Sequence, residues 1–80
     1  MDILTAYQNF RRTMPPGTLQ ELRGKSFVAE FRPSDGWRIL RSDEDDEHLT
    51  AWLLDNNIDL TRVVLDQVPA EPVVGGAQLL

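Results

Sequence analysis

The densest group of side chains that could do chemistry is an acidic run that ends in the single histidine of the chain. Between Ser42 and His48 it holds five carboxylates: Asp43, Glu44, Asp45, Asp46 and Glu47. A helix–loop–helix calcium loop starting at Asp43 requires Gly at its sixth position and Glu at its twelfth, where this chain has His48 and Leu54. His48 with one carboxylate makes a poor transition-metal site. We therefore expect no metal and interpret the run as the acidic first turn of a helix.

The sequence also lacks complete motifs for nucleotide binding and for nucleophilic catalysis. Gly24-Lys25-Ser26 matches the end of a phosphate-binding loop, but the required earlier glycine is Leu19, and the lysine precedes a strand pattern instead of a helix. The chain has one His, one Lys, one Tyr and no Cys, so few nucleophile–base pairs can form. Ser42 and His48 are separated by a helix start and should not point together. We expect no catalytic residue, no cofactor and no enzyme activity.

Composition narrows the class of protein further. Eighty residues fit one domain, and 41% hydrophobic content is enough for a packed core. The net charge of −5 opposes binding to nucleic acid. We find no signal-peptide pattern at Met1–Leu4 and no run of about 20 apolar residues that would span a bilayer. We therefore expect a cytoplasmic protein without direct contact to nucleic acid or membrane.

Periodicity predicts two helical segments in the first third of the chain. Over residues 3–14, apolar side chains recur at helical spacing and share one face: Ile3, Leu4, Tyr7, Phe10 and Met14. Pro15-Pro16-Gly17 ends this helix. Thr18 and Glu21 match a capping box for a short second helix, which Gly24 would end in a left-handed conformation. A short extended stretch is the alternative for this segment.

In the middle of the chain, alternating residues on both sides of a turn sequence predict a β-hairpin. Residues 26–32 alternate, with Phe27, Ala29 and Phe31 on the inner side. Residues 33–36, Pro-Ser-Asp-Gly, form a turn. Residues 37–42 are the partner strand, with Trp37 and Ile39 facing inward.

The last third of the chain predicts a helix, a strand and a tail. The helix begins after Ser42 or Asp43 and runs to about Asn57, and residues 61–68 form a strand. We expect this strand to pair in parallel with one hairpin strand through a right-handed crossover. The expected fold is α+β: two helices plus a short helical turn packed on one face of a three-stranded mixed sheet, in the order α-(α)-β-β-α-β. Residues 1–69 form the single domain and 70–80 a flexible C-terminal tail.

Alternation leaves arginine and apolar side chains on the outward face of the predicted sheet. These residues are Val28, Arg32, Arg38, Leu40, Arg62 and Val64. With both helices on the opposite face, nothing in the chain would cover them. We interpret this face as a contact surface for another protein or for a second copy in a homodimer. An ordinary half-solvated sheet face is the alternative.

These patterns predict a small non-enzymatic protein-binding or regulatory module. It would act through the outward sheet face, through the acidic helix start at Asp43, Asp45 and Asp46, or through both. The alternative is an acidic inhibitor or decoy, of a phage-encoded or immunity type, that occludes a basic or nucleic-acid-binding surface of a target protein. Replacement of Arg32 and Arg38 by alanine would impair partner binding by the sheet-face module. Neutralisation of Asp43, Asp45 and Asp46 would impair target binding by the decoy.

Overall fold

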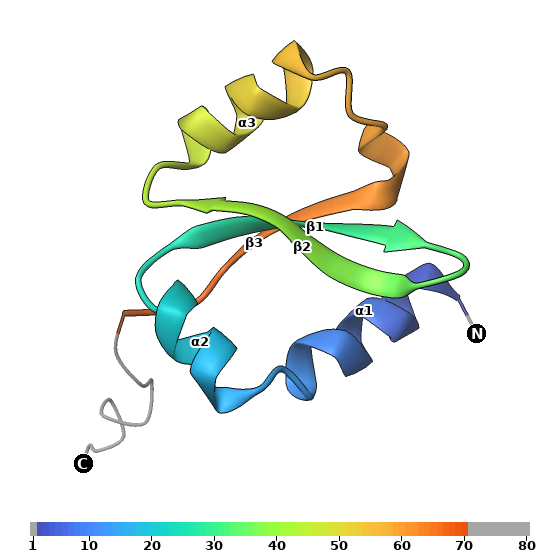
Figure 1. Ribbon diagram of the computed structural model, residues 1–80, viewed down its shortest axis with the longest axis vertical. Helices are drawn as coiled ribbons and strands as arrows, with labels where there is room; N and C mark the ends of the chain where they lie inside the picture. Colours follow the sequence, from blue (N-terminus) through green and yellow to red (C-terminus); the bar gives the residue numbers. More distant parts are fainter. Residues whose placement is uncertain (1, 71–80) are drawn as a thin grey trace.

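The computed structural model describes residues 2–70. Figure 1 shows its elements in the order α1 (Ile3–Arg12), α2 (Pro16–Leu22), β1 (Ser26–Arg32), β2 (Gly36–Asp43), α3 (Asp46–Asp55), the 3-10 helix η1 (Leu60–Arg62) and β3 (Val63–Gln67). The α+β class and the predicted element order are confirmed. Apart from Ala70, the expected tail lies outside the described residues. Within residues 2–70, no helix has the length and apolar content needed to cross a membrane.

The two N-terminal helices begin at different kinds of residue. The Asp2 side chain caps α1 by accepting a hydrogen bond from the Thr5 backbone N–H at 2.7 Å. The expected cap of the second helix was wrong, because α2 begins at Pro16 and Thr18 lies inside it. Proline suits this position since its φ is preset for a helix and its missing N–H would have no helical partner there.

The predicted hairpin is confirmed, with one irregularity that the sequence did not reveal. β1 and β2 are antiparallel, and Gly36 closes the turn at a φ of 77°, which glycine adopts without strain. Val28 pairs with Arg41 but Ala29 pairs with Ile39, so Leu40 is the extra residue of a β-bulge.

The third strand is placed differently from the prediction. β3 pairs antiparallel with β1, not parallel, so the sheet is wholly antiparallel in the order β2-β1-β3. β3 does run in the same direction as β2, but β1 lies between them. The helical connection therefore crosses over β1 and brings β3 to the second edge of β1. Antiparallel pairing at that edge is slightly more stable per residue than parallel pairing.

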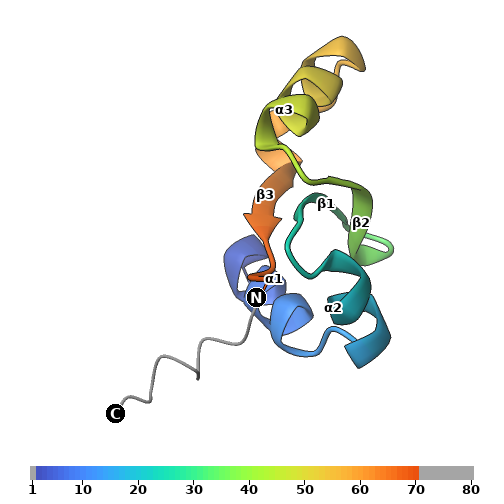
Figure 2. The same cartoon turned by 90° about the vertical axis from the view of Figure 1, so that its left-hand side faces the viewer.

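The helices cover both faces of the sheet, which corrects the expectation that they share one. In both Figure 1 and Figure 2, α1 and α2 lie on one side of the sheet and α3 on the other. Two separate clusters of buried residues result. The first contains Tyr7, Met14, Leu22, Phe27, Ala29 and Val68. The second contains Val28, Leu49 and Leu53. The physical reason lies in the central strand, where consecutive side chains of β1 are apolar and each face must be buried.

Candidate functional site

The apolar residues assigned to an open sheet face do not form an exposed surface. Val28 is fully buried beneath α3, and Leu40 is half-buried against the same cluster. Val64 packs on the other face, against the cluster under α1 and α2. The expectation of an uncovered apolar face is wrong, because α3 packs over Val28 and Leu40.

The three arginines of that predicted set remain accessible and lie at one end of the sheet. Their side chains are all about half exposed: Arg32 50%, Arg38 51% and Arg62 52%. Arg32 ends β1 beside the hairpin turn, Arg38 lies on β2, and Arg62 ends η1 immediately before β3. We call this group the arginine site.

A nearly buried carboxylate holds two of these arginines together. Glu30, whose side chain is 14% exposed, accepts a hydrogen bond from Arg32 Nε at 2.9 Å, and Arg38 Nε lies 3.9 Å from the same Oε1 atom. This hydrogen bond raises the pKa of Arg32 above its ordinary value, so the guanidinium stays charged. Our sequence reasoning missed Glu30. The available signal was its position two residues from Arg32 and, across the hairpin, opposite Arg38.

The third arginine has its own acidic neighbour. Arg62 Nε lies 3.5 Å from Asp59 Oδ2, and Asp59 also caps η1 by accepting from the backbone N–H of Thr61 at 3.0 Å. The hydrogen bonds from Thr61, with the charge of Arg62, lower the pKa of the Asp59 carboxyl. The Nε atom of each arginine of the site therefore lies within 3.9 Å of a carboxylate oxygen.

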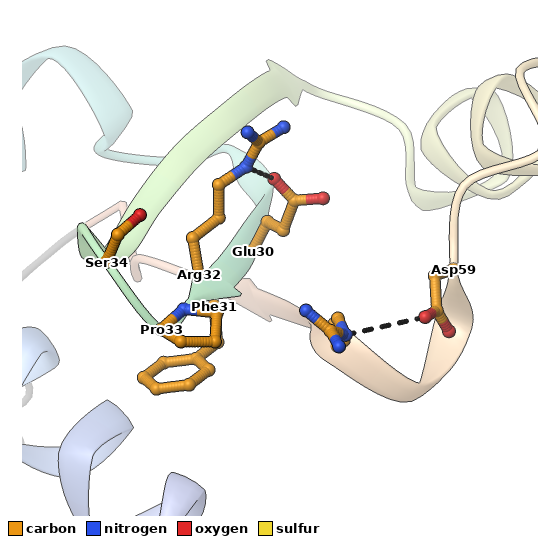
Figure 3. Close-up of a pocket in the computed structure, with 7 residues that line it drawn as sticks. Glu30, Phe31, Arg32, Pro33, Ser34 and Asp59 are labelled. Carbon is orange, nitrogen blue, oxygen red and sulfur yellow. Dashed lines mark hydrogen bonds and ion pairs between the residues drawn. The ribbon is translucent and has the colours of Figure 1, made fainter.

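An open hollow of about 420 Å³ lies between the hairpin turn and η1. Figure 3 shows its lining residues: Glu30, Phe31, Arg32, Pro33, Ser34, Asp59 and Arg62. In this view, the terminal nitrogens of Arg32 point away from Glu30. Within residues 2–70, we find no hydrogen bond from the terminal NH2 groups of Arg32, Arg38 or Arg62. Such free guanidinium groups can bind carboxylate or phosphate oxygens in pairs.

The aspartate carboxylates at the start of α3 accept local hydrogen bonds. Asp43 Oδ1 accepts from the Asp45 backbone N–H at 2.8 Å, and Asp45 Oδ1 accepts from the Glu47 backbone N–H at 2.8 Å. The bond from Asp45 lowers the pKa of Asp43. Asp46 accepts a hydrogen bond from the buried hydroxyl of Ser26. The helix begins later than predicted, with Asp45 as its cap.

The structure gives the single histidine a position beside this turn. His48 Nδ1 lies 3.3 Å from Asp43 Oδ1, and Nε2 lies 3.8 Å from Asp45 Oδ2. In the described part of the chain, no group of three His, Asp or Glu side chains is arranged so that it could hold a metal ion. Backbone hydrogen bonds account for the positions of the Asp43 and Asp45 carboxylates, and the Ser26 hydroxyl accounts for that of Asp46.

Replacement of Asp45 by alanine is expected to lower the free energy of unfolding by about 0.5–2 kcal/mol, because the Glu47 backbone N–H loses its acceptor. Chemical denaturation would measure the loss. Glu44→Ala removes an equal charge from a neighbouring residue that caps nothing, and should change stability by less than about 0.5 kcal/mol. Equal losses in both variants would show that net charge, not capping, is responsible.

The comparisons with protein-family models, curated proteins and solved structures gave no match. The chemistry of the site is therefore derived from its own geometry. Of the residues singled out in the sequence, the structure brings Arg32, Arg38 and Arg62 to one end of the sheet. It separates them from Asp43, Asp45 and Asp46, which lie at the start of α3.

Proposed function

We propose that this protein is a small non-enzymatic binding module whose arginine site holds an acidic segment of a partner protein. The observation that supports the proposal is the gathering of three half-exposed guanidinium groups, from β1, β2 and η1, at one end of a chain whose net charge is −5. Glu30 and Asp59 supply two carboxylates to three guanidinium groups, and a further anion would reduce the repulsion that remains among them.

The site is arranged to receive carboxylates from outside. The Glu30 carboxylate orients the Arg32 guanidinium through a hydrogen bond from Nε, and Arg38 and Arg62 lie within ion-pair distance of Glu30 and Asp59 through their own Nε atoms. The terminal NH2 groups remain available to an incoming carboxylate, which can accept two parallel hydrogen bonds from one guanidinium. Because the Arg32 side chain is already hydrogen-bonded to Glu30, it loses less conformational freedom when a ligand binds than an untethered arginine would.

Protein carboxylates fit this site better than the phosphates of a nucleic acid. The strong acidity of the whole chain repels a long polyanion. The hollow also contains Phe31 and Pro33, which can contact apolar side chains of a peptide. A short acidic segment with neighbouring apolar residues satisfies both features.

The binding test uses a fluorescent peptide, Thr-Val-Thr-Val-Glu-Glu, and fluorescence anisotropy. The double replacement of Arg32 and Arg38 by alanine should weaken binding by tenfold or more, since hydrogen bonds to charged groups contribute about 1.5–3 kcal/mol each. The matched control replaces Arg12 and Arg23 by alanine. Both lie outside the arginine site, and their replacement removes the same amount of positive charge. It should leave the affinity within about twofold, and added salt should weaken binding of the unmodified protein.

Three results would contradict the proposal. The first is equal weakening by the control, which would indicate attraction by overall charge. The second is that the peptide with Lys in place of Glu binds as well as the acidic peptide. The third is that single-stranded oligothymidylate binds the arginine site more tightly than the peptide, which would assign the site to nucleic acid.

A further inference from the structure

One edge of the sheet lies beside the arginine site and has free backbone groups. β3 is an edge strand, paired only with β1 within the described residues. Just after β3, the Val68 N–H donates to Lys25 and the Val68 carbonyl accepts from Gly24, so both groups face toward β1. Backbone direction alternates along a strand. Val63, Leu65 and Gln67 therefore turn their N–H and C=O groups outward, away from β1.

At the far end of this edge, the outward backbone groups of Gln67 are already hydrogen-bonded to side chains. The outward N–H of Gln67 donates to Asp66 Oδ1 at 2.7 Å, and its carbonyl accepts from Arg11 Nη2 at 3.3 Å. Leu65 has no such partner among residues 2–70. The open part of the edge therefore comprises Val63 and Leu65, and it begins directly beside Arg62.

The side chain of Leu65 is also uncovered. Leu65 pairs with Val28, which is fully buried, yet Leu65 is 43% exposed. The difference arises because α3 packs mainly against β1 and β2; on β3, Val63 packs against the cluster under α3, whereas Leu65 is left exposed. Leu60, in the adjoining η1, is 55% exposed. Open backbone groups and exposed leucine side chains thus occur together on the segment that leads to Arg62.

We infer that an extended segment of a partner protein adds to the free edge of β3 as a fourth strand, with its acidic end at the arginine site. This inference rests on the proposed function and specifies how the acidic segment binds. Backbone hydrogen bonds to Leu65 and Val63 supply affinity, and side-chain contacts at Leu65 and Leu60 select apolar residues. An antiparallel strand would run toward Arg62, so its acidic residues follow its apolar ones.

A second copy of this chain fits the edge poorly. Antiparallel pairing of two β3 strands about Leu65 would place Val63 opposite Gln67 of the other copy. The outward groups of Gln67 are already bonded to Asp66 and Arg11, so only the central pair could form. The partner chemistry that fits is an extended apolar segment followed by carboxylates.

The test uses the same peptide, Thr-Val-Thr-Val-Glu-Glu, and a version N-methylated on its first four residues, which cannot donate to the edge. We expect the N-methylated peptide to bind at least tenfold more weakly. We also expect the parent peptide to slow hydrogen exchange of the Leu65 amide, measured by NMR. A pair of protein variants tests the same hydrogen bond from the other side. Leu65→Pro removes the outward backbone N–H of residue 65, whereas Leu65→Thr keeps it, so the proline variant should bind the parent peptide more weakly than the threonine variant. Circular dichroism would establish that both variants fold.

The outcomes separate the two proposals. Equal affinity of the N-methylated and parent peptides, with binding still lost in the Arg32 and Arg38 double variant, would overturn edge pairing and leave the acidic-segment function intact. Absence of binding by the parent peptide would overturn both. Protection of the Leu65 amide that rises with protein concentration alone would assign the edge to a second copy, against the inference.

Discussion

Replacement of Leu49 by alanine is expected to lower the free energy of unfolding by about 2–5 kcal/mol. Leu49 is fully buried, and with Val28 and Leu53 it forms the small cluster that holds α3 on the sheet. A domain of this size has a stability near the low end of about 5–15 kcal/mol. The substitution should therefore populate unfolded protein at room temperature, or detach α3 while the rest of the fold remains.

Leu54→Ala is the matched control, because it is the same chemical change on the same helix at a side chain that is 62% exposed. Its effect should stay within about 0.5 kcal/mol. Urea denaturation followed by tryptophan fluorescence would compare the two variants, since Trp52 lies on α3 and reports its release. Similar losses in both variants would contradict the packing of α3 described above.

The unfolding free energy is also expected to fall as the pH rises above about 10. The Tyr7 hydroxyl donates to Asp66 and ties α1 to β3, and Arg11 Nε lies 3.5 Å from the same carboxylate. Burial, together with the hydrogen bond and negative charge of Asp66, raises the pKa of Tyr7 well above its ordinary value of 10.0. Below pH 10 the phenol is neutral in both states, and its full contribution to stability is present. Above pH 10 the unfolded chain ionises first and unfolding becomes more favourable, by at most about 1.4 kcal/mol per pH unit.

Tyr7 is the single tyrosine of the chain, so the ultraviolet absorbance of tyrosinate reports its ionisation directly. Tyr7→Phe should cost about 1–3 kcal/mol at neutral pH, because Asp66 loses a donor. It should also remove the part of the alkaline loss of stability that belongs to the phenol. Tyrosinate formation near pH 10 in the folded protein would contradict this assignment.

The arginine site shows why the exposure of single residues could be predicted while their surroundings could not. Alternation along β1 and β2 identified Arg32 and Arg38 as outward-facing, and both are accessible. The same alternation grouped them with Val28, which α3 buries. A strand pattern tells which residues share a face, but it does not tell which other element covers that face.

The sequence by itself determined the local structure of this protein. Proline and glycine placed the breaks and the hairpin turn. Apolar periodicity identified two helices and the three strands, and a capping-box pattern indicated the short second helix, although its cap was assigned to the wrong residue. The α+β class followed from that order. These features depend on neighbours in the chain, so they can be read from short stretches of residues.

Only the tertiary structure decided the pairing of β3 with β1, the position of α3 on the second face, and the gathering of Arg32, Arg38 and Arg62 around Glu30 and Asp59. Each depends on contacts between residues far apart in sequence, and several arrangements satisfy the same local pattern. The choice among them comes from burying both apolar faces of the central strand at once, which is a property of the whole packed domain.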